Sequence, residues 1–432
     1  MATTYKLPLK QHIGAPDEPV VKIGETIRRG AVVARAKGLG ADIHASVSGR
    51  VIDISETFIE IGYDPSIEDG FDPIPDEGSI VDKVRAAGIV GMGGAGFPTH
   101  VKLSTDLAGG TILANGAECE PLLGHNIQQI TEDPGILYRG MKYAMEATNA
   151  AHGVLAIKQK NAEAIASFRQ VLKPDDNITI HELPDLYPMG EERAVVREVL
   201  GTTLAVDQLP AAAGAVVLNV ETLACITRAV EDLRPVMTKN VTVLGKIGDG
   251  RTLRVFMDVP IGTTVRELID RAGGFDGEYG EIIMGGPFTG KAVQPGDVIT
   301  KTTGGIIVTM EFPRVKQPLG LLVCACGGNE ERMRDIAAKM DANVVSVRCC
   351  KQAKDVRGTL KCENPGNCPG QAEKIMELYK EGARALLVGN CSDCTNTVMC
   401  VAPKLKLPVY HQTDHVMRTM GHSLIRRLPV NE

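Results

Sequence analysis

The sequence predicts an α/β protein of several domains, and three features of the chain support this. After residue 80, segments with strand character alternate with amphipathic segments, the pattern of a sheet covered by helices. Residues 1–75 hold short alternating apolar runs punctuated by glycine, with hardly any helical pattern. Residues 316–432 repeat a strand–helix unit. We therefore expect units at residues 1–75, 80–235, 239–313 and 316–432.

Composition excludes some classes of function. The net charge of -6 argues against a nucleic-acid-binding protein, which needs clustered Lys and Arg. The first residues, "MATTYKLPLKQHIG", lack the apolar stretch of a signal peptide, and no apolar run is long enough to span a bilayer. We expect a cytoplasmic protein whose membrane association, if there is any, is made through a partner.

The first unit consists of "PVVKIGETIRRGAVVARA" and "ADIHASVSGRVIDI", two glycine-punctuated strand patterns. They resemble a lipoyl-type barrel-sandwich hybrid, but the turn lacks the lysine that carries lipoate or biotin. This favours a docking role over a covalent carrier role. The Pro/Asp/Gly-rich segment 64–79 is expected to be a linker. Residues 239–313 are expected to form a β-grasp unit and resemble the soluble-ligand-binding β-grasp (SLBB) module.

The segment "GMGGAGFPTHVK", residues 91–102, is the most unusual loop of the second unit. Glycine allows a flat ring or a phosphate to approach the main chain closely. The loop follows a helix and not a strand, so it is not a dinucleotide-binding fingerprint. Taken alone, it fits a ligand-binding loop and a plain tight turn equally well.

Three further stretches, "ANGAECEP", "YPMGEERAVVREVLG" and "VVLNVETLA", place polar residues where strands end or helices begin. With the glycine loop, in this order, they resemble the flavin subunit of respiratory NADH dehydrogenase and, more closely, the C subunit of Rnf electron-transport complexes. That resemblance implies a Rossmann-like α/β domain in which FMN lies on the glycine loop and NADH stacks on the flavin.

Carried over to this sequence, the resemblance assigns three groups of residues. The FMN cradle would be Gly91, Gly93, Gly94 and Lys102. Hydrogen bonds to FMN would come from Asn115, Glu118, Cys119, Gly190, Glu191, Asn219 and Thr222. The nicotinamide site would be lined by Phe97, Glu120 and Glu192. Ala117 and Leu218 stand where the NADH dehydrogenase family has Asp and Asn, which predicts weaker FMN binding.

Nine of the eleven cysteines lie between Cys324 and Cys400. Several follow predicted parallel strands, whose carboxyl ends share one edge of a sheet, so we expect their thiols to converge. Helix starts expected at 327–329 and after Cys394 favour thiolates. Cys225 and Cys400, within helices, are expected to be core thiols.

The converging thiols fit an iron–sulfur cluster, a dithiol relay or a structural zinc site, and the ferredoxin-type "CxxCxxCxxxCP" run of the Rnf family is absent. Cys324 and Cys326 are the expected redox-active, catalytic pair. The expected metal ligands are Cys349, Cys350, Cys362, Cys368, Cys391 and Cys394.

The whole chain resembles the proline reductase-associated electron-transfer proteins of amino-acid-fermenting anaerobes. This implies an NADH-dependent flavin oxidoreductase that passes electrons through FMN and the C-terminal cysteines to a partner reductase, D-proline reductase, within an oligomer or complex. A ferredoxin or a membrane Rnf-type complex could replace NADH as donor. The alternative is a non-catalytic scaffold with an empty flavin cleft and a structural zinc site.

Overall fold

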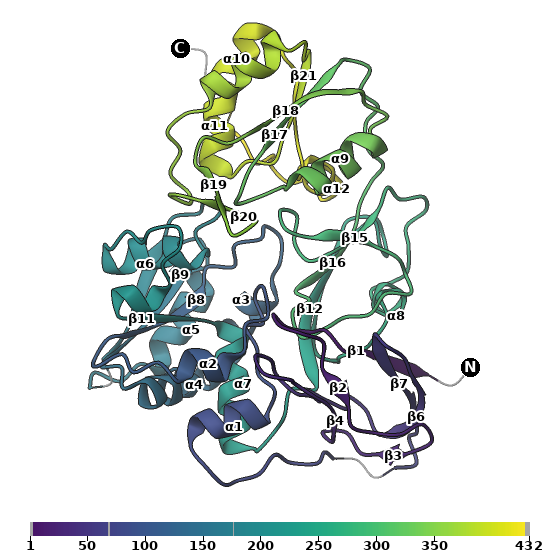
Figure 1. Cartoon of the computed structure of the whole chain (residues 1–432), viewed down its shortest axis with the longest axis vertical. Helices are drawn as coiled ribbons and strands as arrows, with labels where there is room; N and C mark the ends of the chain where they lie inside the picture. The colour runs from purple at the N-terminus through teal and green to yellow at the C-terminus, as the bar shows by residue number, and fades with distance from the viewer. Residues whose placement is uncertain (1–2, 68–69, 176, 428–432) are drawn as a thin grey trace.

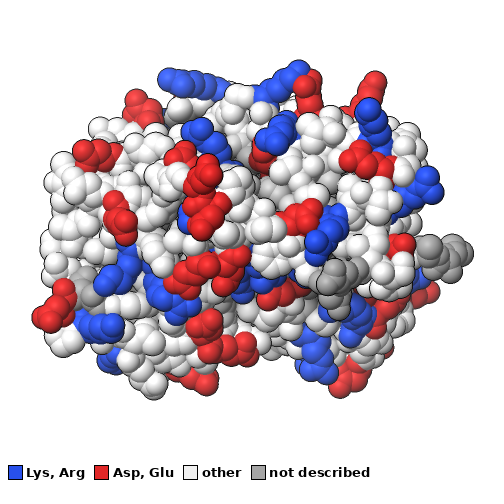
Figure 2. Space-filling view, turned by 90° about the horizontal axis from the view of Figure 1, so that it is seen from below, with Lys and Arg blue, Asp and Glu red and all other residues white. Residues whose placement is uncertain are grey.

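The computed structural model describes residues 3–67, 70–175 and 177–427. Figure 1 shows the C-terminal unit at the top, the α/β unit at the left below it, and the N-terminal strands, in purple, at the lower right. Seen from below, acidic and basic side chains are interspersed, so this face offers no continuous basic surface for a phosphate backbone (Figure 2). Within the described residues, no helix has the length and apolar character that crossing a bilayer requires.

The N-terminal unit consists of two antiparallel sheets, as the glycine-punctuated apolar runs predict. Alternate residues of the longer strands, such as Ile59 and Ile61, are buried between the sheets. One sheet has the order β1 (Thr4–Pro8), β7 (Phe58–Tyr63), β6 (Gly49–Ile54), β3 (Thr26–Ile27), and the other β2 (Glu18–Pro19), β4 (Val32–Arg35), β5 (Ile43–His44). Residues 64–67 and 70–79, on the expected linker, contain no helix or strand.

The second unit is a parallel four-stranded sheet, in the order β10 (Ile178–Leu183), β9 (His152–Lys158), β8 (Thr111–Gly116), β11 (Ala215–Asn219). Two apolar clusters form its core, and the larger one continues into the N-terminal unit. Its helices are α1 (Ile80–Ala86), α2 (Thr99–Leu103), α3 (His125–Glu132), α4 (Pro134–Thr148), α5 (Ala162–Val171), α6 (Glu192–Leu200) and α7 (Val220–Glu231). Because the strands are parallel, the polar residues that follow them meet at one edge.

The third unit is a mixed five-stranded sheet with one helix, α8 (Val265–Arg271). Its order is β13 (Thr252–Pro260), β12 (Thr238–Gly245), β16 (Gly305–Val308), β14 (Ile282–Met284), β15 (Lys291–Val293). Only the central β12–β16 pair is parallel, and the other pairs are antiparallel.

The C-terminal unit contains the parallel sheet that its strand–helix repeats predict, in the order β18 (Val344–Cys349), β17 (Leu319–Val323), β21 (Ala385–Val388), β22 (Val409–His411). One apolar cluster packs α9 (Glu330–Lys339) on the sheet, and a second packs α10 (Ala372–Lys380) and α11 (Ser392–Val401) on it. The last helix, α12 (Asp414–Thr419), is shorter than the sequence pattern suggests and ends before Gly421, which has a positive φ of 65°.

The segment expected to be a long loop, 353–369, contains a β-hairpin instead. Strands β19 (Ala353–Val356) and β20 (Thr359–Cys362) pair antiparallel. The two turn residues, Arg357 and Gly358, both have positive φ values, of 55° and 79°, as the tight two-residue hairpin turn requires. The hairpin fixes the position of Cys362, which a loop would leave undefined.

A buried carboxylate joins the third unit to the fourth. Glu281 pairs with Arg332 and, at 2.6 Å, with Lys339 of α9, and it lies 2.9 Å from His415 Nε2 of α12. Burial alone would raise the pKa of Glu281, but hydrogen bonds with His415 and Arg332 outweigh burial and hold that pKa far below its usual range. The C-terminal sheet is therefore held in one orientation on the third unit.

Candidate functional site

The glycine loop between α1 and α2 is tied at its base. Gly91 N–H donates to Phe97 O at 2.9 Å. The buried Thr222 hydroxyl, on α7, accepts from Met92 N–H at 3.0 Å and donates to Val90 O at 3.2 Å. Thr222, expected to contact FMN, thus contacts the main chain of the loop in this structure.

The tip of the loop, Gly93 to Ala95, is exposed. A Cβ on Gly93 would lie 2.5 Å from Asn219 Nδ2, so only glycine permits this approach. A Cβ on Gly94 would meet no atom within 4 Å. Asn219 begins α7 and accepts from Glu221 N–H at 2.8 Å. The loop therefore presents open main chain beside a helix N-terminus, an arrangement that suits an anionic group.

The predicted polar stretches meet at the carboxyl edge of the sheet. Asn115 and Asn219 are partners in register on the adjacent strands β8 and β11. Asn115 Nδ2 donates to Gly190 O at 2.8 Å, while its Oδ1 accepts from Ala117 N–H at 3.2 Å. Glu191 is the N-cap of α6 and accepts from two N–H groups of its first turn. The stretches come together as predicted, but mainly by bonding to one another.

Lys102 and Glu192 lie near the same edge and form an ion pair. Lys102 Nζ also donates to Val217 O at 3.0 Å, which holds the ammonium beside β11. The Glu192 side chain is 42% exposed and free to exchange this partner for a ligand. Ala117 and Leu218, where the NADH dehydrogenase family has polar residues, are both buried in apolar clusters.

Burial favours the protonated forms of two groups that follow β8. It raises the pKa of Glu118 to about 7, although Asn126 Nδ2 donates to that carboxylate at 2.7 Å. It raises the pKa of the Cys119 thiol to about 12, although Gly190 N–H points to its sulfur at 3.4 Å. Glu118 can therefore hold or release a proton near neutral pH.

Glu120 joins the α/β edge to the third unit. Its carboxylate accepts from Phe288 N–H and Thr289 N–H, both at 2.8 Å, and from the Thr289 hydroxyl at 2.6 Å. Burial raises its pKa against these three bonds. Both carboxylate oxygens are thus engaged at a domain boundary, where the resemblance places a nicotinamide contact.

Two residues of this edge carried no signal in the sequence analysis. Tyr187, in the quoted stretch "YPMGEE", stacks on Phe288 with ring centroids 3.6 Å apart and donates its hydroxyl to Cys326 O. Ser392 N–H donates to Tyr187 O at 3.3 Å. Lys158 ends β9, is 5% exposed and lies 3.2 Å from Asp185. In the sequence, the buried charge of Lys158 is indicated only by the position of this lysine at the end of an apolar strand pattern.

Four thiols of the C-terminal unit converge. Cys350, Cys391 and Cys394 are buried in one cluster, and Cys368 packs against it. The neighbouring Cys394 thiol lowers the pKa of Cys350 to about 7 and that of Cys368 to about 6, and the pKa of Cys394 is raised. Gln371 Nε2 donates to Cys350 Sγ at 3.1 Å and Cys368 Sγ at 3.4 Å. The helix start thus does not favour a thiolate at Cys394, and the more acidic thiols are those of Cys350 and Cys368.

We term Cys350, Cys368, Cys391 and Cys394 the thiol quartet. Cys326 packs against the same cluster, and its main-chain N–H donates to Cys324 Sγ at 3.4 Å. Cys349, the last residue of β18, is exposed, whereas Cys350, which follows the strand, is buried. Cys400, expected in the core, is also exposed because it lies on the outer face of α11. All eleven cysteines are free thiols.

As the side chains stand, no group of three or more His, Cys, Asp or Glu residues in the described parts of the chain is arranged to hold a metal ion. The amide nitrogen of Gln371 lies among the sulfurs of the quartet, and its distance to Cys394 Sγ is 3.9 Å. Its Oε1 is buried and has no hydrogen-bond partner among the described residues. The quartet is thus a convergent set of soft donors beside an amide oxygen that lacks a partner.

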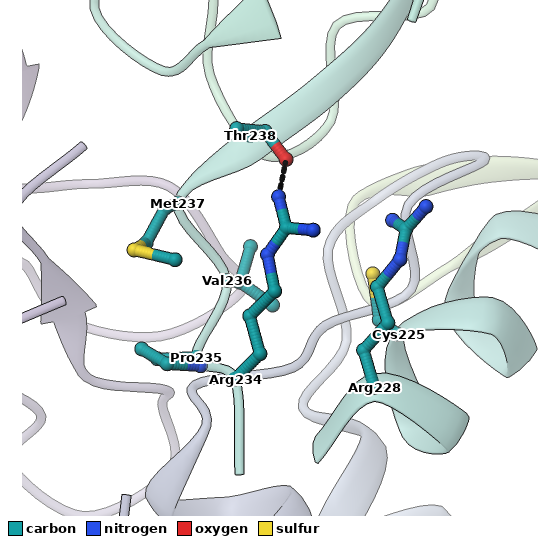
Figure 3. A pocket seen from close by; sticks show the side chains of 7 residues that line it. All are labelled: Cys225, Arg228, Arg234, Pro235, Val236, Met237 and Thr238. Carbon is teal, nitrogen blue, oxygen red and sulfur yellow. Dashed lines mark hydrogen bonds between the residues drawn. The ribbon is translucent and has the colours of Figure 1, made fainter. Parts of the chain in front are cut away.

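Cys225 is a core thiol, as expected. It donates to Met92 Sδ at 3.5 Å behind the glycine loop, and burial raises its pKa to about 11. With Arg228 and Arg234 it lines a small pocket, in which Arg234 Nη2 donates to Thr238 Oγ1 at 3.3 Å (Figure 3). The Cys225 thiol therefore packs against Met92, on the buried side of the glycine loop.

Comparison with known proteins identifies the first two units. Residues 1–66 match the RnfC barrel sandwich hybrid domain, and residues 84–228 match the Nuo51 FMN-binding domain. The C subunit of the Na(+)-translocating ferredoxin:NAD(+) oxidoreductase complex of Acetobacterium woodii is 33% identical over 340 residues, covering 74% of this chain and 76% of that protein. Its equivalent in the proton-translocating complex of Clostridium ljungdahlii is 34% identical over 323 residues, 70% of this chain and 69% of that protein.

The cobalamin reductase PduS of Salmonella typhimurium is 43% identical over 230 residues, 53% of this chain. The aligned part is 49% of PduS, so the chain spans about half the length of that relative. Among solved structures, the NAD+-reducing NiFe hydrogenase in its H2-reduced state is similar with a TM-score of 0.45 and 22% identity, over 54% of this chain and 46% of that one.

These matches define a protein that joins a barrel-sandwich hybrid domain to an FMN-binding domain of the Nuo51 type. The chain belongs to the Rnf complex C-subunit family, within the superfamily of the NADH dehydrogenase flavin subunit.

The raised pKa of Glu118 leads to a prediction about stability. Between the unfolded value near 4.5 and the folded value near 7, the folded state holds the extra proton, so folding becomes less favourable as pH rises through this window. Glu118→Gln is expected to be more stable than the wild type by about 2 kcal/mol at pH 8, and by much less at pH 5. Denaturant unfolding at both pH values measures this, with the exposed Glu163→Gln as control. A pH-independent difference would contradict it.

Proposed function

We propose that this protein is an electron-transfer flavoprotein that accepts electrons from NADH on FMN and passes them through its C-terminal cysteines to a partner reductase. Membership of the Rnf C-subunit family and the match to the Nuo51 FMN-binding domain support the flavin and nicotinamide parts of the proposal. The single observation that carries it is the open main chain of the glycine loop beside the α7 N-terminus, on the same edge of the sheet that meets the terminal cysteines.

The residues present fit FMN in three ways. The exposed tip offers unpaired main chain at Gly93 and Gly94, and the Gly94 face is clear of other atoms. Lys102 places a cation near the strand end, where it can neutralise a phosphate. Asn219 places the positive end of α7 beside the loop. FMN bound there would supply the two-electron acceptor for a hydride from NADH.

The same edge offers groups for the nicotinamide nucleotide. Phe97 is half-buried at the base of the loop and can support a planar ring. Glu192 is well exposed and can accept bonds from ribose hydroxyls. Glu118 can hold a proton at the edge near neutral pH. In this arrangement Glu120 acts indirectly, since it fixes the turn that carries Phe288.

For the cysteines, we propose that the thiol quartet holds an iron–sulfur cluster. Four converging soft donors match the number and type of ligands that such clusters need. The buried Gln371 Oε1 beside these sulfurs has no hydrogen-bond partner among the described residues, and a group bound there would supply one. We also propose that the third unit is an SLBB-type β-grasp domain that docks the partner. The N-terminal hybrid domain is proposed to dock the partner as well.

Two acceptors are candidates. D-proline reductase follows from the resemblance of the whole chain to proline reductase-associated proteins. A corrinoid is the second candidate, favoured by the 43% identity to cobalamin reductase PduS. With NADH as donor under anaerobic conditions, we expect the protein to reduce D-proline reductase faster than it reduces hydroxocobalamin. Stopped-flow absorption measures both rates, and the reverse order would replace the first acceptor with the second.

The flavin site can be tested at Gly94, where a side chain meets no protein atom. Gly94→Val should leave folding unchanged but occupy the face on which the flavin lies, lowering the flavin retained per chain by about tenfold or more. Gly296→Val, at another glycine with free space around a Cβ, is the matched control. The wild type should be yellow and bleach with NADH under anaerobic conditions. A colourless wild type that takes up no added FMN would refute the flavoprotein proposal.

The cluster proposal can be tested at Cys394, the sulfur shared by the quartet. Cys394→Ser should lose iron, acid-labile sulfide and their visible absorption, because a hydroxyl is a poor ligand for such a cluster. Cys349→Ser, at the exposed neighbouring thiol, should retain them. Anaerobic iron and sulfide analysis gives the answer, and wild-type protein free of both would show that the quartet holds no such cluster.

A further inference from the structure

The C-terminal end of the glycine loop is in direct contact with the N-terminal hybrid domain. Ile13, in the segment between β1 and β2, donates its main-chain N–H to Gly96 O at 3.2 Å. Gly96 is buried and has a positive φ of 70°. A Cβ on Gly96 would lie 3.1 Å from both Gln11 O and the Cα atom of His12. Glycine at this position therefore permits the close approach of the two domains.

The third unit holds the hybrid domain and the loop together at the same place. Lys301 N–H donates to Gln11 Oε1 at 3.1 Å. The buried ammonium of Lys301 donates to Asp42 O at 2.6 Å and to Gly88 O at 2.8 Å, just before the glycine loop. Thr302 Cγ2 would lie 3.1 Å from a Cβ on Gly96. Contacts from other domains thus fix the chain on both sides of the exposed tip, and the charge-assisted bonds of Lys301 are the strongest of them.

The segment that carries Ile13 is itself well ordered. His12 Nε2 lies 2.7 Å from Asp17 Oδ1, and both of these side chains are fully buried. The other ring nitrogen of His12 lies 3.0 Å from Ile13 O. A Cβ on Gly14 would lie 2.2 Å from Leu39 O, so the next residue packs tightly on a neighbouring turn. The main chain of Ile13 is therefore fixed from both sides.

The side chain of Ile13, in contrast, is open to solvent. It belongs to a residue that is 42% exposed, and the tip of the glycine loop, residues 93–95, is exposed as well. An exposed aliphatic side chain is ordinary when it stands alone on a surface. Here the main chain of the same residue is bonded to Gly96, the neighbour of the tip. An apolar group is thus placed next to the main chain that would carry a flavin.

We propose that Ile13 is a further flavin-binding residue, through which the hybrid domain supplies an apolar contact to the cofactor at the glycine loop. The α/β edge offers the flavin mainly open main chain and charged groups, because its polar side chains largely bond to one another. A flavin ring has a large apolar area, and removing part of it from water stabilises the complex. The inference rests on the proposed function for the identity of the ligand.

The contact can be tested by the affinity of the full-length protein for FMN, measured through the quenching of flavin fluorescence. Ile13→Asn replaces the apolar side chain by an uncharged polar one, and should raise the dissociation constant about tenfold. Ile13→Leu keeps the apolar contact and should restore the wild-type value. The matched control is Ile23→Asn, at a residue of the same domain that is 64% exposed, and it should bind FMN as the wild type does. Equal affinity in Ile13→Asn and the wild type would overturn the inference.

A second measurement remains informative if Ile13→Asn does not fold. The thiol introduced by Ile13→Cys is alkylated with and without saturating FMN, and its rate is followed by mass spectrometry of that peptide. Bound FMN should slow this alkylation by about tenfold or more, because the cofactor covers the side chain. The thiol introduced by Ile23→Cys should react at the same rate in both samples. An Ile13→Cys thiol that FMN leaves unprotected would contradict the proposed contact.

FMN uptake by the wild type separates this inference from the proposed function. A wild type that takes up no FMN would refute the flavoprotein proposal, and the role of Ile13 with it. A wild type that binds FMN, together with an Ile13→Asn variant of equal affinity and an unprotected Ile13→Cys thiol, would refute the role of Ile13 alone.

Discussion

The structure depends on the carboxylate of Glu120 at the junction of three domains. Removing a carboxylate from water is costly unless hydrogen bonds replace the lost hydration, and the N–H groups of Phe288 and Thr289 provide that replacement. This contact fixes the turn of the third unit on the α/β edge. Phe288 then stacks on Tyr187, whose hydroxyl reaches the carbonyl of Cys326. Without this junction, the terminal cysteines would have no defined relation to the glycine loop.

Most polar side chains at this edge of the sheet make contacts within the protein. Thr222 holds the loop, Glu191 caps a helix and Glu120 binds a neighbouring domain. What remains available to a ligand is mostly main chain at the loop tip, together with the ends of long side chains. A site of this kind depends on the exact backbone path of the loop, and Thr222 and the Gly91–Phe97 bond maintain that path.

Burial also divides the junction electrostatically. Near the glycine loop, desolvation raises the pKa of Glu118 to about 7 and that of the Cys119 thiol to about 12. In the terminal domain, the Cys394 thiol and the Gln371 amide lower the pKa values of Cys350 and Cys368. Groups with raised pKa values therefore lie beside the glycine loop, and the more acidic thiols lie in the terminal domain.

Periodicity and turn chemistry in the sequence were enough to predict the parallel sheet of residues 316–432, the all-β N-terminal unit and the glycine loop, because strand alternation and glycine content are local properties. The four ordered motifs were also enough to place the chain in its family. The sequence could not show that Glu120 binds a neighbouring domain, or that Tyr187 links the flavin edge to Cys326, because those partners lie 168 and 139 residues away. The sequence predicted that thiols would converge, but it could not show that Cys350, Cys368, Cys391 and Cys394 pack in one cluster while Cys349 and Cys400 are exposed. Tertiary packing decides which sulfurs are buried together.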